Sequence, residues 1–315
     1  MSKSPSIIVV AMNPALEKHY LVPRLAPGGR SEAQRAESFA GGGGPAVART
    51  LSALGADYLL AAVLGGQNGS LIEEELEKTG ARAALVRSES DSPLRISVFD
   101  QHSSLKTVIS EPGIIDSDEE TEEIMALLRR AAAGAKVACL SGPPAKGAPK
   151  DVYARLVALF RAHGVKTVVD APAETLEASL WQKPHAIKPN LEELSFLAKE
   201  QVSEVNQVID AAGRLVARGV GLAAVSMGAR GALLINRREA VWVAPPKLAK
   251  VALSGCGYSL SGALAFAMAL EMSLEDTARI AVAASAASAL TPAPGGFKMA
   301  HFEAISREVS ITRLA

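Results

Sequence analysis

The sequence predicts an α/β fold with parallel strands, and three observations lead to this fold class. Short apolar runs recur along the chain, as in residues 6–12, 58–64 and 167–170, and the first of them is rich in β-branched residues. Such runs are typical of strands buried on both faces of a parallel sheet. Segments with apolar residues at helical spacing separate the runs, and glycines or polar residues follow most of them, where open α/β sheets place their ligands.

Composition limits the kinds of protein that this chain can be. Its 315 residues, 49% of them hydrophobic and 21% charged, can bury a large core as one α/β domain or two smaller ones. Acidic and basic residues both number 33 and no basic run stands out, which favours small ligands over nucleic acid or a membrane surface. No apolar run reaches membrane-spanning length without interruption. Cys139 and Cys256 lack a CxxC spacing and no signal-peptide pattern opens the chain, so we expect a cytoplasmic protein.

The first predicted strand, residues 6–12, leads into polar groups at Asn13 and Glu17. Two weaker strands follow at residues 18–22 and 32–39, separated by a turn rich in proline and glycine. Their composition is typical of exposed strands, so a small separate sheet is expected there.

A run of four glycines, Gly41 to Gly44, precedes Pro45 and a predicted helix at residues 46–54. Glycines before a helix let a ligand approach the backbone closely, although a flexible linker would have the same composition. Pro45 at the first helical position favours an ordered start. A strand at 58–64 and a serine-capped helix at 70–79 then continue the β-α alternation.

Three short strands are predicted next, at residues 83–86, 94–98 and 106–110. They could join the earlier exposed pair in a small sheet that covers the carboxyl edge of the main sheet. The α/β alternation then returns with helices at 118–133 and 150–163 and strands at 137–140, 167–170, 186–188 and 223–226.

Two later motifs follow strand ends. Asn190 and Glu193 lie three residues apart at a helix start and could order waters around a magnesium ion, although acidic first turns also complement the helix dipole. After the strand at 223–226, a turn containing Gly228 and Gly231 leads into another strand. Such a glycine-bearing hairpin at a strand end is typical of a nucleotide-binding edge.

The stretch at 251–262, which runs into an apolar helix, has the pattern of a phosphate-binding turn. Gly255 and Gly257 flank Cys256, so successive N–H groups can point at one spot near the positive end of the helix. Simple capping of a buried helix would select similar residues. A phosphoryl-transfer enzyme needs a carboxylate after the second glycine, to accept the proton of the attacking hydroxyl, and this chain has Tyr258 there.

In order and spacing, these motifs resemble those of the PfkB, or ribokinase-like, carbohydrate kinases over nearly the whole chain. The resemblance is greatest to the branch of 1-phosphofructokinases and tagatose-6-phosphate kinases. The matching motifs are Asn13-Pro14-Ala15, Gly41 to Gly44 with Val47-Ala48, Glu111-Pro112-Gly113, Ser141-Gly142, Lys188 to Leu194, Ser226 to Gly231 and Gly255-Cys256-Gly257.

The resemblance implies a ribokinase-like three-layer fold, with a mainly parallel sheet, helices on both faces and a small β lid that often mediates dimers. Residues 1–16, 40–90 and 114–315 would form the main nucleotide-binding domain, and residues 17–39 with 91–113 the lid. It further implies ATP with Mg²⁺, transfer of the γ-phosphoryl group to a sugar hydroxyl, a sugar-phosphate-like second ligand and a homodimer formed through the lid.

The resemblance also assigns roles to single residues. Gly255, Cys256 and Gly257 would form the anion hole. The nucleotide side would comprise Lys188, Asn190, Glu193, Ser226, Gly228 and Gly231, with Glu193 near the metal through water. The substrate side would comprise Asn13, Glu17, Gly42, Gly43 and Arg95, of which Arg95 matches an arginine that meets the sugar phosphate.

The departures from the family pattern all lie on the acceptor side. Tyr258 replaces the aspartate base, Glu17 a sugar-binding aspartate, Gly43 a lysine and Ala46 an asparagine. A positioned base is worth roughly 10²- to 10⁴-fold in rate, and a tyrosine with a pKa of about 10 is a poor substitute. Loss of the lysine removes an ionic hydrogen bond worth about 1.5 to 3 kcal/mol.

Three hypotheses follow for the function. The chain is a weak or retargeted sugar kinase in which another carboxylate, such as Glu17, serves as base. Alternatively, it is a pseudokinase that binds nucleotide or sugar phosphate as a sensor or partner subunit. The third hypothesis is a purely structural subunit of a dimer.

Overall fold

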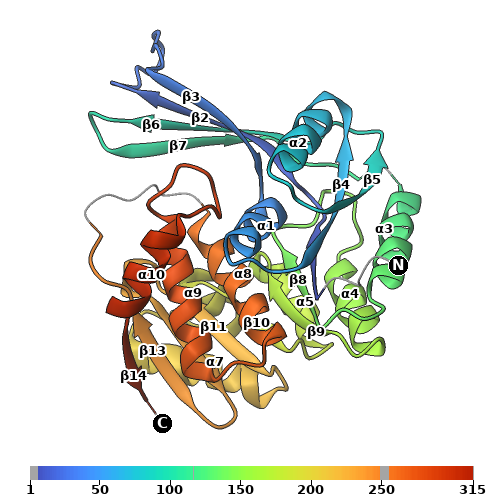
Figure 1. Cartoon of the computed structure of the whole chain (residues 1–315), viewed down its shortest axis with the longest axis vertical. Helices are drawn as coiled ribbons and strands as arrows, with labels where there is room; N and C mark the ends of the chain where they lie inside the picture. Colours follow the sequence, from blue (N-terminus) through green and yellow to red (C-terminus); the bar gives the residue numbers. More distant parts are fainter. Residues whose placement is uncertain (1–5, 116, 249–254, 315) are drawn as a thin grey trace.

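The computed structural model describes residues 6–115, 117–248 and 255–314. Within these ranges the strands form a ten-stranded sheet and a separate four-stranded sheet (Figure 1). From one edge to the other, the large sheet consists of β14 (Ser310–Arg313), β13 (Ala240–Ala244), β12 (Ala232–Asn236), β11 (Leu222–Ser226), β10 (Ala186–Ile187), β9 (Lys166–Asp170), β8 (Val137–Ser141), β1 (Ile7–Ala11), β4 (Tyr58–Gly65) and β5 (Ala83–Ser88).

The seven strands from β11 to β5 run parallel, and β12, β13 and β14 add an antiparallel edge. All five residues of β1 are buried, as expected for a central parallel strand covered on both faces. The mainly parallel sheet predicted from the sequence is therefore confirmed.

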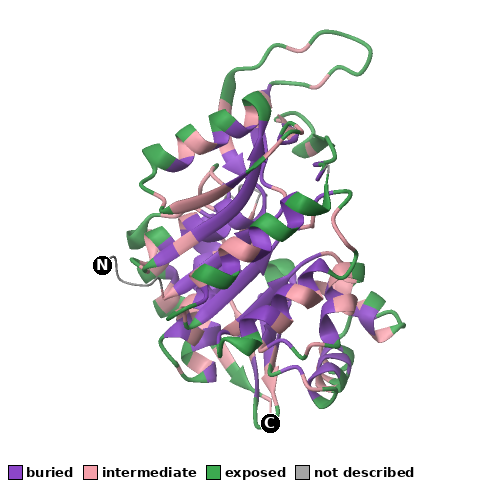
Figure 2. Cartoon of the chain, turned by 90° about the vertical axis from the view of Figure 1, so that its right-hand side faces the viewer, coloured by how far each residue is buried: buried purple, intermediate pink, exposed green. Residues whose placement is uncertain are grey.

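Helices cover both faces of the large sheet. They are α1 (Gly43–Ala53), α2 (Gly66–Lys78), α3 (Asp118–Ala131), α4 (Val152–Ala162), α5 (Ala173–Leu180), α6 (Leu191–Ala198), α7 (Val205–Ala217), α8 (Cys256–Ala269), α9 (Leu274–Ser288) and α10 (Met299–Glu308). Alternate residues of β1 pack into different cores: Ile8 and Val10 contact the side of α3 to α7, and Ile7 and Val9 the side of α1, α2 and α8 to α10. Buried strands between two helical layers are visible in Figure 2, so the three-layer prediction is confirmed.

The small sheet has the order β3-β2-β6-β7 and stands apart from the large one (Figure 1). Its strands are β2 (Ala15–Val22), β3 (Arg35–Gly41), β6 (Leu94–Asp100) and β7 (Leu105–Ser110), of which β2 and β6 run parallel. The suggestion that residues 83–86 join this sheet is wrong, because they form β5 and pair with β4 at the edge of the large sheet. Helix α2 is the crossover that this parallel pairing requires.

Two helices begin earlier than the sequence predicted. Helix α1 starts within the glycine run at Gly43, and α2 starts at Gly66 and not at Ser70. The cap of α2 comes from a distant residue, because the Gln67 amide donates to Asp91 Oδ1 at 3.1 Å. The Asp91 carboxylate thus accepts from a free amide in the first turn of α2, the role that was predicted for Ser70 from the sequence.

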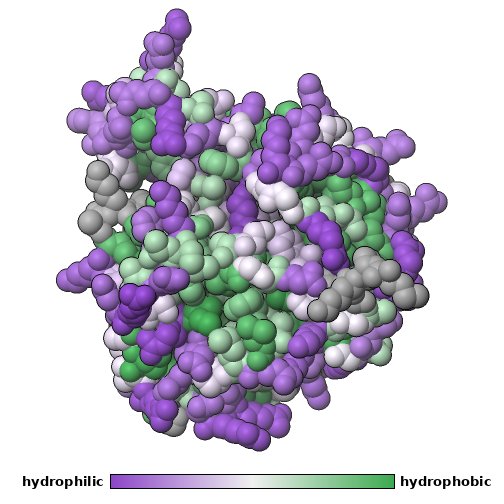
Figure 3. All heavy atoms as spheres, in the orientation of Figure 1, coloured by the Kyte–Doolittle hydropathy of each residue, from purple (hydrophilic) through white to green (hydrophobic). Residues whose placement is uncertain are grey.

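Hydrophilic and hydrophobic residues are unevenly distributed over the surface in Figure 3. Hydrophilic residues dominate the periphery of the face in Figure 3, and hydrophobic residues gather where α8 to α10 lie, below the small sheet. None of the helices in the described ranges is long and apolar enough to cross a membrane.

Candidate functional site

The glycine turn at the start of α8 has the geometry of an anion-binding site. Gly255 caps the helix with φ +75°, a left-handed conformation, and a Cβ atom there would lie 2.5 Å from Pro294 Cβ. Glycine is thus required by both conformation and space. Cys256 and Gly257 occupy the first two helical positions, whose N–H groups have no acceptor within the helix and suit an anion. Residues 251–254 of the predicted stretch lie outside the described residues.

A buried ion pair lies directly beneath this turn. Lys188 Nζ is 3.1 Å from Asp170 Oδ1, and both residues are only 5% exposed. Ser261 Oγ donates to the other oxygen, Asp170 Oδ2, at 2.6 Å. A Cβ on Gly257 would lie 3.6 Å from Lys188 Nζ, so the ammonium group contacts the turn. Lys188 therefore adds a fixed positive charge to the anion site, and Asp170 fixes its position.

Tyr258 is the third residue of α8 and lies close enough to Asp170 to interact with it. Burial raises the pKa of Tyr258 to about 12, and nearby Asp170 reinforces the shift. The same phenol also interacts with Arg95 and Glu17 from the small sheet. At neutral pH the group is a neutral phenol, so it cannot act as an efficient proton acceptor.

Glu17 is buried in β2 and fully engaged by donors. Its Oε1 accepts from Arg95 Nη1 at 2.8 Å and from the Gly42 amide at 3.3 Å, and its Oε2 lies 3.2 Å from His19 Nε2. Burial would raise the pKa of Glu17, but the His19 hydrogen bond and the Arg95 charge outweigh it and hold the pKa at about 2. So weak a base argues against Glu17 as a replacement for the missing aspartate.

The face of the small sheet that carries Glu17 also presents two cations. Arg95 pairs with Glu17 in the strand register, and Lys106 pairs with Phe99 on the same face. Lys106 Nζ lies 5.4 Å from the Phe99 ring centroid. Its pKa is lowered by burial, and it interacts with Glu17, Arg95 and Cys256. Lys106 thus faces the start of α8, although nothing in its local sequence singles it out.

The glycine run leaves no room for side chains. A Cβ on Gly43 would lie 2.6 Å from Ser141 Oγ, so the lysine of the family pattern could not be accommodated without a shift of the β8 end. A Cβ on Gly41 would lie 2.1 Å from Glu17 Cγ. Glu17 therefore occupies the volume above the run, and the helix α1 begins tightly against β8.

Asn13 lies at the end of β1, where the sequence placed it near the substrate. Its Oδ1 is buried, and among the described residues it has no hydrogen-bond donor. A Cβ on Gly113 would lie 1.9 Å from the same atom, so Gly113 is packed against the Asn13 amide. The carboxyl ends of β1 and β8 each carry such a group, since Ser141 Oγ is also buried without a partner in the described residues.

Asn190 and Glu193 form a reciprocal capping box at the start of α6. The Asn190 amide donates to Glu193 Oε2 at 2.8 Å, and the Glu193 amide donates to Asn190 Oδ1 at 2.8 Å. Burial raises the pKa of Glu193. No group of three or more His, Cys, Asp or Glu residues suited to direct metal binding occurs in the described ranges. One Glu193 oxygen lies outside the box and would be available to a metal-bound water.

Three of the six predicted nucleotide residues, Ser226, Gly228 and Gly231, line one cavity with the glycine turn, whereas Lys188, Asn190 and Glu193 do not line it. It has a volume of about 650 Å³. Its polar and backbone-rich wall comprises Ser226, Gly228, Ala229, Gly231, Gly255, Cys256 and Gly257. Apolar side chains close the other sides, among them Pro245, Leu248, Leu260, Val282, Ala286 and Ala289. An apolar slot that ends at an anion-binding turn is suited to a planar base attached to phosphates.

Comparison with known proteins identifies related chains of similar length. Residues 9–297 match the pfkB family of carbohydrate kinases. A 1-phosphofructokinase of Rhodobacter capsulatus is 30% identical over 280 residues, which are 89% of each chain. A tagatose-6-phosphate kinase of Staphylococcus epidermidis is 27% identical over 97% of this chain and 99% of its own. The structure of phosphofructokinase-2 from Escherichia coli in complex with substrates and products superposes with a TM-score of 0.91 at 25% identity, covering 96% and 98% of the two chains.

Proposed function

Because this chain belongs to the pfkB family of carbohydrate kinases, we propose that it binds ATP and transfers phosphoryl groups slowly to an alcohol group of a sugar or sugar phosphate. The observation that carries the proposal is the cavity that joins an apolar slot to the glycine turn, with Lys188 beneath that turn. Phosphoryl transfer depends mainly on positioning and charge stabilisation, and both remain without a base.

The proposed nucleotide site uses residues on either side of the turn. Ser226, Gly228 and Gly231 would contact the nucleoside, and the amides of Gly255, Cys256 and Gly257 the phosphate that is transferred. Lys188 would neutralise part of its charge. ATP as the nucleotide is supported by the name of one relative, the ATP-dependent 6-phosphofructokinase isozyme 2 of Escherichia coli, which is 26% identical over 90% of this chain.

A magnesium ion would fit the site through water. Glu193 is partly buried near Lys188, and its capping-box geometry holds the carboxylate in place. When bound, Mg²⁺ would supply positive charge that offsets the charge developing on the phosphate during transfer. Asn190 and Glu193, which hold each other in the capping box, would orient its waters.

The acceptor side would be assembled from Asn13, Glu17, Gly42, Gly43 and Arg95, with Tyr258 at the position of the family base. Arg95 is 28% exposed at its side chain, so part of the guanidinium can still meet an anionic acceptor. The Tyr258 phenol accepts a proton poorly, and the Glu17 carboxylate is held near a pKa of about 2. Transfer is therefore expected to lack the contribution of a general base, roughly 10²- to 10⁴-fold in rate.

A pseudokinase is the second candidate, and the Glu17 cluster favours it. Glu17 already binds Arg95, the Gly42 amide and His19, so this charged cluster is paired without substrate. An ADP-release assay over a panel of sugars and sugar phosphates separates slow catalysis from none. Calorimetry with Mg²⁺ and the non-hydrolysable analogue AMP-PNP separates both from a purely structural subunit, and absence of binding would remove the nucleotide assignment.

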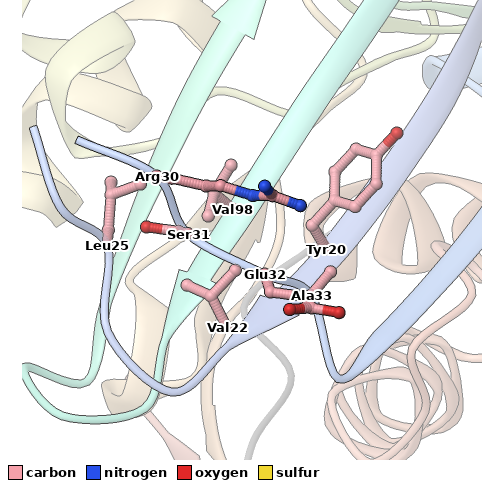
Figure 4. A pocket seen from close by; sticks show the side chains of 8 residues that line it. All are labelled: Tyr20, Val22, Leu25, Arg30, Ser31, Glu32, Ala33 and Val98. Atoms are coloured by element: carbon pink, nitrogen blue, oxygen red, sulfur yellow. The ribbon is translucent and has the colours of Figure 1, made fainter. Parts of the chain in front are cut away.

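We assign the lid role to residues 17–39 with 91–113, and homodimer formation to its outer face. Tyr20 and Val98 pair on the face opposite to Glu17, and Ile109 and Leu105 of β7 share that face while 62% and 68% exposed. A pocket of about 390 Å³ next to Tyr20, Val98 and Arg30 gives this face a recess (Figure 4). Exposed apolar residues around a recess are typical of a surface that packs against another chain. Light scattering of the purified protein tests for the dimer.

A further inference from the structure

We propose that Arg49 and Glu75 form a positioning clamp that couples nucleotide binding at the glycine turn to the small sheet. The proposal rests on the proposed nucleotide site. Arg49 lies on α1 and Glu75 on α2, and their ion pair of 2.8 Å is largely buried, with the Arg49 side chain 12% exposed. Neither residue lines the nucleotide cavity. They would act through the backbone segments that they hold.

One end of the clamp holds the base of the small sheet. Arg49 Nη2 donates to the Ala40 carbonyl at 2.7 Å, and the Ala40 amide donates to Glu75 Oε2 at 2.7 Å. Both polar backbone groups of this β3 residue are thus fixed by one ion pair. Ala40 is followed within two residues by Gly42, whose amide binds Glu17. The position of Ala40 therefore sets the position of the charged cluster on the acceptor side.

The other end of the clamp reaches the glycine turn. Arg49 Nη1 donates to the Pro294 carbonyl at 3.0 Å. Pro294 packs on Gly255 so closely that a Cβ on Gly255 would lie 2.5 Å from Pro294 Cβ. Gly295, which follows Pro294, is fixed as well, because its carbonyl accepts a hydrogen bond from the Thr50 hydroxyl at 2.9 Å. A segment packed this tightly cannot move without moving the turn or opening a void.

Three separate parts of the fold therefore meet at one planar guanidinium. Its Nη1 and Nη2 atoms reach the Pro294 carbonyl, the Ala40 carbonyl and the Glu75 carboxylate. A lysine ammonium has one nitrogen on a flexible stem and cannot reproduce such a fork. Ordering of the turn by a nucleotide would pass through Pro294 and Arg49 to Ala40 and hence to the small sheet. Without the Arg49 guanidinium, the small sheet should no longer respond to nucleotide binding at the glycine turn, while the nucleotide still binds.

Hydrogen exchange of the full chain tests the clamp, with Mg²⁺ and AMP-PNP as the probe. In the wild type we expect slower exchange in residues 255–260 and also in β2 and β3, by about fivefold or more, the lower end of usual coupling between sites. Arg49→Lys should retain the protection at 255–260 and lose that in β2 and β3. Glu75→Gln, which keeps the side-chain shape, should lose part of it.

Arg87→Lys is the matched control. Arg87 forms an ion pair of 2.7 Å with Glu73, which lies on the same helix α2 as Glu75, but the Arg87 side chain is 61% exposed against 12% for Arg49. The variant should behave as the wild type. Two results would overturn the clamp. Either β2 and β3 remain protected in Arg49→Lys, or they are not protected in the wild type although residues 255–260 are. Absence of protection at 255–260 in the wild type removes the nucleotide site itself, and the coupling with it.

Discussion

Replacement of Tyr258 by aspartate should increase the rate of phosphoryl transfer. The pKa of the Tyr258 phenol is about 12, so at pH 7 only about one molecule in 10⁵ carries a phenolate. An aspartate has a reference pKa of about 3.9 and would be ionised. Its neighbours oppose one another, because Asp170 and Glu17 would raise its pKa and Arg95 would lower it.

The expected gain in kcat is about 10²-fold, the lower end of the range for a positioned base. We place it there because removal of the partly buried Tyr258 ring also leaves space, and truncation of a fully buried ring costs about 3 to 5 kcal/mol of stability in other proteins. Tyr258→Asn is the matched control, because it opens the same space without supplying a base. ADP release is measured for the wild type and both variants over the same panel of sugars and sugar phosphates.

The comparison between the two variants decides the argument. An aspartate variant that exceeds the asparagine variant by about 10²-fold supports the missing-base explanation. Equal rates in the two variants, or a wild type with a kcat in the usual kinase range of about 1 to 100 s⁻¹, would contradict it. Equal gains in both would instead indicate that the ring blocks the acceptor.

Three further predictions concern the charges and the outer face of the small sheet. Lys188→Met should destabilise the fold by about 3 to 5 kcal/mol in urea denaturation, because it leaves Asp170 buried and unpaired, and the double variant with Asp170→Asn should recover much of that loss. Glu17 has a folded pKa of about 2, below its ordinary value of 4.5, so its stabilisation of up to about 3 kcal/mol is present above pH 4.5 and lost as the pH falls towards 2; Glu17→Gln should lose this part of the pH dependence. Leu105→Asp should convert the proposed dimer to a monomer in light scattering while AMP-PNP binding is retained, and an unchanged mass would contradict the assigned interface.

Local patterns predicted the main strands and the glycine turn well. The strand at residues 6–12 follows from a run of β-branched apolar residues. The turn from Gly255 to Gly257 requires a positive φ at Gly255, and the two glycines in the sequence point to such a turn. The pairing of β5 was harder, because a half-buried run of six residues fits either sheet. Only the crossover through α2 assigns it to the large one.

The charged part of the site depends on contacts between distant segments. Asp170, Lys188 and Ser261 come from the end of β9, the end of β10 and the middle of α8, and no spacing rule links them. A carboxylate at the carboxyl end of a parallel strand was the one available signal for Asp170. Lys106 had none, since its orientation follows from the register of β7 with β6.

The changes on the acceptor side form one consistent arrangement. Decay of an unused site would leave buried charges unpaired, at a cost of about 1 to 3 kcal/mol for each unsatisfied group. Here the Glu17 carboxylate has three donors, and the volume above Gly41 is filled by its side chain. An acceptor that binds productively must therefore compete with Glu17 for Arg95, whereas a nucleotide meets an anion site whose lysine already contacts the turn. The two halves of the site should consequently differ in ligand affinity, with nucleotide binding the stronger.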